Sequence, residues 1–154
     1  MTVTPGVTDP WPMSSQPGGD SDWDLVLAHR PPGTRDPVRE RFAGAGVTPE
    51  QVWAALEDSG DALFAAARSG RPDWAGPFGG PLAVALLAAE VSALTAHLTS
   101  RGSAIRALAV EALLDDYSAV TVAGRLGVSR QKVYEIARPN PTGSFIDHAR
   151  ERSS

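Results

Sequence analysis

The chain has 154 residues, which suits one compact domain with tails. It carries 14 Lys and Arg residues against 18 Asp and Glu, and this formal net charge of −4 excludes a protein that coats DNA by bulk positive charge. The absence of cysteine excludes disulfides, a thiol nucleophile and metal sites with Cys ligands. The three histidines are scattered, so no metal ion or other cofactor is predicted.

Both ends of the chain are predicted to be tails. Residues 1–22 are rich in Pro, Gly, Ser and Asp and lack a periodic apolar pattern, so we expect them to be disordered. Residues 140–154 form the second predicted tail. The chain starts without a basic segment followed by an apolar run, so no secretion signal is predicted and a cytoplasmic location is expected.

Residues 23–100 are predicted to form a helical domain. A short helix is expected over residues 36–44, with Asp36 as its N-cap and a proline in its first turn. A second apolar stripe at helical spacing covers residues 49–68 and begins with the capping-box pattern of Thr48. Gly60 lies inside this stripe, where we expect the helix to bend or break.

Residues 81–100 give the strongest helix signal of the chain, rich in Ala and Leu. The segment is almost long enough to cross a bilayer, but Glu90 lies at its centre, so the pattern favours a buried helix of a soluble protein over a membrane span. Such an apolar helix must be covered by neighbours. Glu90, His97 and Arg101 share one strip, for which a solvated or hydrogen-bonded role is favoured over a metal or acid–base pair.

Residues 101–139 carry the functional signal. Three short helices are predicted, over residues 103–115, 119–126 and 129–138, and the first is expected to place Ile105 and Leu108 on its buried face. The last two helices are joined by a short turn. A steep crossing there needs a small residue at the closest approach and a residue tolerant of positive φ in the turn, which Ala123 and Gly127 supply.

Five further apolar positions agree with this arrangement and are expected in the shared core, namely Val122, Leu126, Val128, Val133 and Ile136. The segment therefore resembles the helix-turn-helix motif of bacterial regulators. Within that group it is most similar to the homeodomain-like trihelical module of resolvase and invertase C-termini and of small repressors. An ordinary helical hairpin with a glycine C-cap is the alternative.

The resemblance implies that the helix at 129–138 enters the major groove of double-stranded DNA. At about 100° per residue, Arg130, Gln131, Tyr134 and Arg138 fall on the side away from Val133. Arginine can pair with guanine and glutamine with adenine. Ser129 begins the helix and can approach a phosphate, and two flanking cations suit backbone contacts, Arg125 and Lys132.

The distribution of charge along the chain also favours DNA binding by the C-terminal segment. Residues 1–100 carry 6 basic and 12 acidic residues, whereas residues 119–138 carry 4 basic residues and 1 acidic residue. A locally basic tip on an acidic body is typical of a protein that reads DNA sequence without coating DNA.

The sequence predicts a small transcriptional regulator of all-α class, a helical bundle with a C-terminal trihelical helix-turn-helix module. One such module binds weakly alone, so a homodimer is expected. Residues 49–100 could form the dimer interface, bind another protein, or be the interior of one domain. The alternative function is a helical protein–protein interaction module, adaptor-like or antitoxin-like. No catalytic constellation is found, and residues 1–100 do not resemble a resolvase catalytic domain, so no enzyme is predicted.

Overall fold

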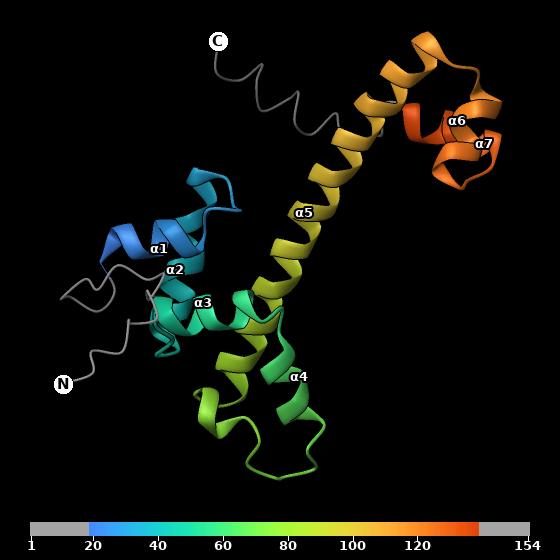
Figure 1. Ribbon diagram of the computed structural model, residues 1–154. Coiled ribbons are helices and arrows are strands. Elements are labelled where there is room, and N and C mark those ends of the chain that lie inside the picture. Colours follow the sequence, from blue (N-terminus) through green and yellow to red (C-terminus); the bar gives the residue numbers. More distant parts are fainter. Residues whose placement is uncertain (1–18, 139–154) are drawn as a thin grey trace, which may run out of the picture. The chain divides into compact units, whose positions relative to one another are not determined.

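The computed structural model describes residues 19–138, and every regular element in this range is helical (Figure 1). The predicted all-α class is therefore confirmed. The elements are α1 (Asp20–Val26), η1 (Pro32–Thr34), α2 (Arg35–Gly44), α3 (Pro49–Glu57), α4 (Asp61–Ala67), η2 (Gly76–Phe78), α5 (Pro81–Asp116), α6 (Ala119–Leu126) and α7 (Arg130–Ala137), where η denotes a 3-10 helix. The predicted tail at residues 140–154 lies outside the described residues.

The chain divides into two compact units, with the division inside α5. Unit 1 runs to Leu94 and unit 2 starts at Thr95. The sequence predicts this boundary between residues 100 and 101, where two separate helices are expected. Because α5 continues through that point, it contributes its first part to unit 1 and its last part to unit 2.

The first described helix starts inside the segment predicted to be disordered. Residues 1–18 lie outside the described residues, but residues 20–22 belong to α1, so the predicted tail is too long at this end. Asp20 and Asp22 occupy the first turn, where a negative charge is favoured by the helix dipole. Trp23 buries its ring against Phe42 of α2, with ring centroids 5.8 Å apart, and this packing holds the short helix.

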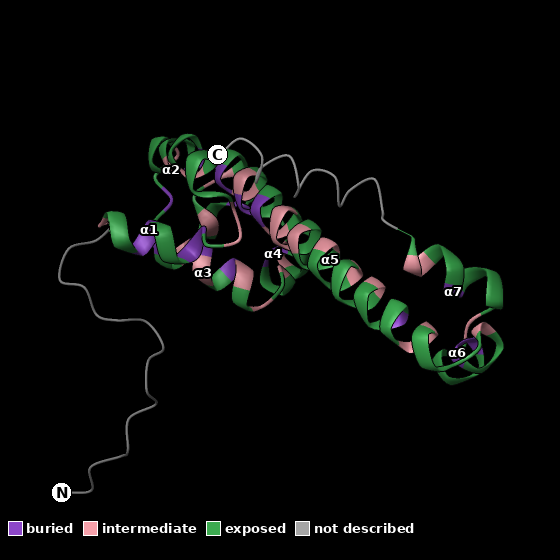
Figure 2. Cartoon of the chain, turned by 90° about the horizontal axis from the view of Figure 1, so that it is seen from above, coloured by how far each residue is buried: buried purple, intermediate pink, exposed green. Residues whose placement is uncertain are grey.

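Unit 1 has one hydrophobic core, built by α1 to α4 and the first part of α5. The apolar stripes read from the sequence supply it, and its fully buried side chains include Leu27, Phe42, Val52 and Leu87. Burial of an aliphatic or aromatic side chain of this size stabilises the fold by about 1.5–3 kcal/mol. Figure 2 shows buried residues in purple, within α1, α3 and α5 among other places.

The start of α2 differs from the prediction. Asp36 is predicted as the N-cap, but α2 begins at Arg35 and its N-cap position is Thr34. The reason is that η1 leads directly into α2, so the backbone is already helical before Asp36. Asp36 instead lies in the first turn, where the helix dipole favours a negative charge.

The stripe predicted over residues 49–68 forms two helices. The capping box at Thr48 is present: its hydroxyl accepts from the Gln51 amide at 3.3 Å, and the Gln51 side chain accepts from the Thr48 amide at 2.8 Å. The helix then breaks between α3 and α4. Gly60 takes a φ of 80°, and Asp58 accepts hydrogen bonds from the amides of Gly60 and Ala62.

Helix α5 is continuous over 36 residues, although two helices are predicted, over residues 81–100 and 103–115. Gly102 lies in its interior without ending it. A glycine costs about 1 kcal/mol relative to alanine in a helix, and the surrounding Ala, Leu and Arg residues favour the helix enough to offset this. By length and composition alone α5 is also long enough and apolar enough to cross a membrane, a test that core helices of soluble proteins pass as well.

Candidate nucleic-acid interface

The turn between α6 and α7 has the local geometry that the sequence predicts. It spans three residues, beginning with Gly127, which takes the left-handed conformation with φ 68° and ψ 32°. The Val128 amide closes the end of α6 by donating to the Ala123 carbonyl at 3.1 Å. Ser129 is the N-cap of α7 and accepts from the Lys132 amide at 3.1 Å. Local sequence therefore determines where both helices end and begin.

A small core joins α6 and α7 to the last part of α5. Val122 and Val133 are buried, together with Ala123 and with Val110 of α5. Val128 and Ile136 are half-buried and pack against this group. Five of the six predicted apolar and small core positions therefore meet in one cluster.

Leu126 is the exception, because its side chain is 42% exposed. It lies in the last turn of α6, and the turn at Gly127 carries the chain away before any described residue covers it. On α5, Ile105 and Leu108 are also predicted to face the core, but they are 62% and 68% exposed. Val110 is buried instead, and Leu113 packs beside it. The first helix of the predicted trio is therefore rotated about its axis relative to the expectation.

The polar face of α7 is exposed. Gln131 lies on the side away from Val133, about 160° around the helix from it. Arg130 and Tyr134 lie closer to Val133, at about 60° and 100°, but both are exposed, Tyr134 by 50%. Arg138 follows the helix in an extended conformation and is exposed as well. All seven side chains predicted to meet DNA are exposed on unit 2, the others being Arg125, Ser129 and Lys132.

Both flanking cations, Arg125 and Lys132, contact a neighbouring side chain within unit 2. The Arg125 guanidinium lies 4.8 Å from the centre of the Tyr117 ring, which orients the side chain by a cation–π contact. Lys132 Nζ lies 3.6 Å from Glu135 Oε2, and both side chains are half exposed. An exposed ion pair of this kind is worth about 0–1 kcal/mol, so it does not prevent Lys132 from approaching a phosphate.

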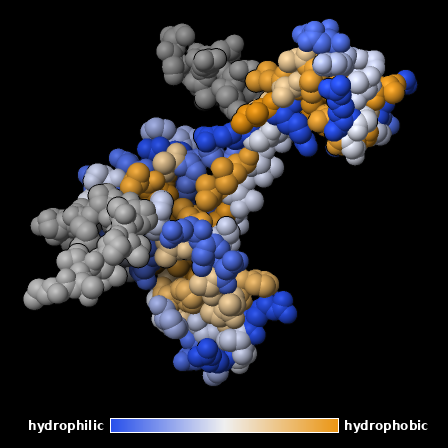
Figure 3. Space-filling view, in the orientation of Figure 1, coloured by the Kyte–Doolittle hydropathy of each residue, from blue (hydrophilic) through white to orange (hydrophobic). Residues whose placement is uncertain are grey.

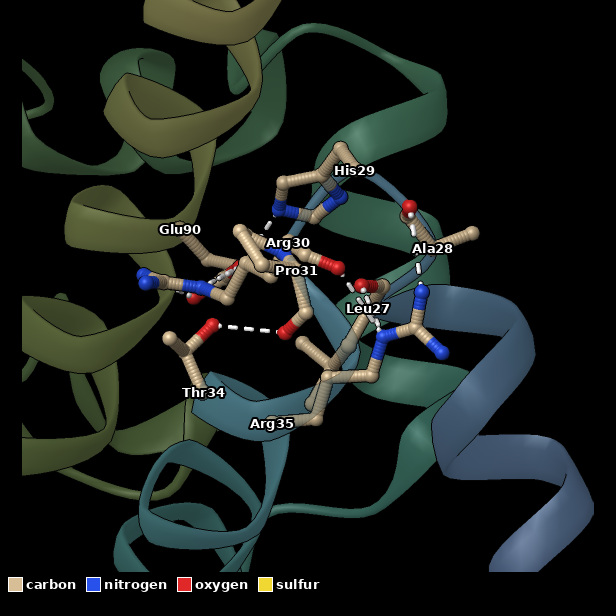
Figure 4. Close-up of polar contacts among 8 residues, drawn as sticks. All are labelled: Leu27, Ala28, His29, Arg30, Pro31, Thr34, Arg35 and Glu90. Carbon is tan, nitrogen blue, oxygen red and sulfur yellow. Dashed lines mark hydrogen bonds and ion pairs between the residues drawn. The ribbon is translucent and has the colours of Figure 1, made fainter. Parts of the chain in front are cut away.

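Unit 1 contains a polar cluster that the sequence does not reveal (Figure 4). Glu90 of α5 is 2% exposed and faces the loop that follows α1. Its Oε1 lies 2.6 Å from His29 Nε2 and accepts from Arg30 Nε at 2.8 Å, while its Oε2 accepts from Arg30 Nη2 at 3.0 Å. The carboxylate is therefore held by the His29 ring and by the Arg30 guanidinium, which donates to both of its oxygens.

This cluster connects two segments that are sixty residues apart in the chain. The hydrogen bonds that Arg30 donates to Glu90 raise the pKa of Arg30, although partial burial of the guanidinium opposes the shift. Arg35 secures the same loop by donating from Nε to the carbonyl oxygens of Leu27 and Arg30. His97, the partner suggested by the polar strip, is not part of the cluster. A lone carboxylate in an apolar run was the one signal that could have indicated a buried cationic partner.

Unit 1 also has apolar grooves, and no group of side chains among residues 19–138 could hold a metal ion. One groove, with a volume of about 390 Å³, lies between α4 and α5, where Phe64, Trp74 and Val91 line it. No acid–base pair converges on it. The arrangement that offers recognition chemistry is therefore the exposed face of α7.

Comparisons with protein-family models, with curated proteins and with solved structures found no match for this chain.

Proposed function

We propose that this chain binds double-stranded DNA sequence-specifically through unit 2, and acts as a small transcriptional regulator in the cytoplasm. One observation carries the proposal: α7 buries Val133 behind a three-residue turn and leaves its Arg- and Gln-bearing face exposed. A helix presented in this way fits the width of the major groove. The role requires no cofactor and no bond-making step.

Three exposed side chains of α7 match base edges. The Arg130 guanidinium can donate two hydrogen bonds to guanine O6 and N7. The Gln131 amide can pair with adenine N6 and N7 in the same two-point manner. Tyr134 offers a hydroxyl for a phosphate or a ring for a thymine methyl group. Together these groups support discrimination between bases.

Phosphate contacts would come from residues around this face. Ser129 begins α7, where backbone amides and the helix dipole favour an anion. Arg125 and Lys132 lie beside the face, and residues 119–138 carry 4 basic residues against 1 acidic residue. Such contacts orient the protein on the duplex, and they make the affinity depend on salt.

The first test is binding of the full chain to random-sequence duplex DNA by fluorescence anisotropy at low salt. We expect binding that weakens as salt rises, with a slope of about −0.9 in log K per log salt for each phosphate contacted. Selection of bound fragments from a random pool then identifies the preferred site. Failure to bind any duplex at low salt would reject the proposal.

We predict that Arg130→Ala and Gln131→Ala each weaken binding to the selected site by about 1–3 kcal/mol and relax specificity at one base position. Circular dichroism should remain unchanged, since both side chains are exposed. Arg68→Ala is the matched control, because this exposed arginine belongs to unit 1 and should leave affinity unchanged. Equal affinities for the control and both α7 variants in a mobility-shift titration would contradict the groove assignment.

A second candidate function has its own observation in unit 1. Phe64 is 63% exposed and lines the groove of about 390 Å³ between α4 and α5. Exposed aromatic side chains beside an apolar groove are typical of protein-binding surfaces. A helical protein–protein interaction module therefore becomes the better description if the chain binds no duplex DNA.

A further inference from the structure

The part of α5 that belongs to unit 2 has an uncovered row of large aliphatic side chains. Leu98, Ile105 and Leu108 are 53%, 62% and 68% exposed. At about 100° per residue they share one side of the helix, and Val110, which packs against α6 and α7, lies on the other. We call these three residues the α5 seam. Figure 3 shows hydrophobic residues at the surface along α5.

The seam has the spacing of a helix that pairs with another helix. Its members are separated by seven and three residues, and Ala112 continues the pattern four residues further on. This spacing repeats every 3.5 residues, as in two-stranded coiled coils. Arg101 lies on the same side of the helix, between Leu98 and Ile105. The flanking positions include the small residues Gly102, Ala104 and Ala109, which let a second backbone approach closely.

Charges along the same segment are separated by sign. Arg101 and Arg106 lie in its first half, and Glu111, Asp115 and Asp116 lie in its second half. All five are exposed, and none forms an ion pair within residues 19–138. The two aspartates also lie at the C-terminal end of α5, where the helix dipole disfavours negative charge. A cation from outside the chain would stabilise them.

We propose that the α5 seam pairs with the seam of a second copy of this chain, with the two helices antiparallel. A two-fold axis between Arg106 and Ala107 brings Ile105 of each copy against Leu108 of the other. At this register Arg101 of each copy lies opposite Ala112 of the other, and Leu98 lies opposite Asp115, within one helical turn of Ala112. Such an interface is self-complementary, as a symmetric dimer requires.

Charge complementarity selects this orientation. In the antiparallel pair, Arg101 of each copy lies within one helical turn of Glu111 and Asp115 of the other. In a parallel pair, Arg101 would face Arg101 and Asp115 would face Asp115. Because like charges at an interface oppose association, the parallel arrangement is disfavoured and the antiparallel one is attractive at both ends.

The dimer would also set the distance between the two DNA-binding units. This expectation rests on the proposed function. The last residues of the two α5 helices lie about 30 Å apart along the pair, at 1.5 Å per residue from the two-fold axis. Two half-sites that face the same side of DNA are separated by about 34 Å. We therefore expect the selected DNA site to be an inverted repeat.

The test measures the dimer dissociation constant of the full chain, without DNA, by sedimentation velocity over a range of concentrations. We expect Ile105→Ser and Arg101→Glu each to raise this constant by about tenfold or more. Arg106→Glu is the matched control: the residue is exposed on the same helix but away from the seam, so association should be unchanged. Circular dichroism establishes that each variant retains its helical content.

A charge exchange identifies the orientation. The variant Glu111→Arg/Asp115→Arg should associate weakly, and adding Arg101→Glu to it should restore the homodimer, because opposite charges then meet again in the antiparallel pair. In a parallel pair the triple variant would still place like charges together and stay weak. Failure of this restoration overturns the antiparallel arrangement.

Two further outcomes overturn the pairing itself. One is a chain that stays monomeric at every concentration tested. The other is a monomeric chain that floats with phosphatidylcholine vesicles, which would mean that lipid covers the seam. The DNA proposal is tested separately: a monomer that binds DNA rejects only the dimer, and a dimer that ignores duplex DNA at low salt rejects only the DNA contact.

Discussion

Replacing Arg30 with alanine is expected to destabilise unit 1 by about 3 kcal/mol, near the lower end of the range for breaking a buried ion pair. Glu90 is 2% exposed, and Arg30 supplies two of its three polar contacts, at 2.8 and 3.0 Å. Without Arg30 the carboxylate remains buried with His29 as its remaining partner. The folded state then contains a buried negative charge with too few partners, and this lowers the free energy of unfolding of unit 1.

Urea unfolding followed by tryptophan fluorescence measures this loss, since the tryptophans among the described residues, Trp23, Trp53 and Trp74, all belong to unit 1. Arg39→Ala is the matched control. Arg39 also pairs with carboxylates, but its partners Asp20 and Asp36 are 89% and 77% exposed, so its removal should cost less than about 1 kcal/mol. Equal midpoints for the two variants would show that the Glu90 cluster does not stabilise unit 1.

Replacing Gly127 with valine is expected to destabilise unit 2 by about 1–3 kcal/mol, the usual cost of a residue held in an unfavourable backbone conformation. Gly127 has φ 68°, a region that β-branched residues avoid. A Cβ atom added there meets no other atom within 4 Å, so the penalty comes from the backbone and not from a clash. Because few side chains of unit 2 are fully buried, a loss of this size should open α6 and α7.

Amide hydrogen exchange over α6 and α7 measures the effect. Gly127→Asn is the first control, because asparagine tolerates the left-handed conformation and should retain most of the protection. Gly124→Ala is the second: this glycine is inside α6, has open space around its Cβ position, and should gain about 0.5–1 kcal/mol. Faster exchange in the asparagine variant than in the valine variant would contradict the backbone explanation.

The sequence predicted the features that depend on near neighbours. The caps at Thr48 and Ser129 and the positive φ of Gly127 are present as expected. The break near Gly60 is present too. Each of these depends on hydrogen bonds or torsion angles within a few residues, so the local pattern suffices.

The candidate interface was predictable for the same reason. Once α7 starts at Ser129 and buries Val133, helical periodicity places Gln131 on the other side and Tyr134 about a quarter-turn from Val133. Arg130 lies three residues before Val133, about 60° from it around the helix, and is exposed in the first turn. The sequence could not show that Leu126 is exposed, because its burial depends on whether another segment covers the end of α6. It also could not fix the rotation of α5, which follows from how Val110 packs in the small core of unit 2.

The sequence by itself therefore determined the all-helical class, the caps and the polar face of α7, because these follow from periodicity and from bonds between close neighbours. Only the tertiary structure decided that α5 runs unbroken through Gly102, that Glu90 is held by His29 and Arg30, and that Ile105 and Leu108 face outward. The physical reason is that burial and ion pairing depend on which segments, distant in the sequence, pack together in the fold. The periodicity of the local sequence does not show which segments these are.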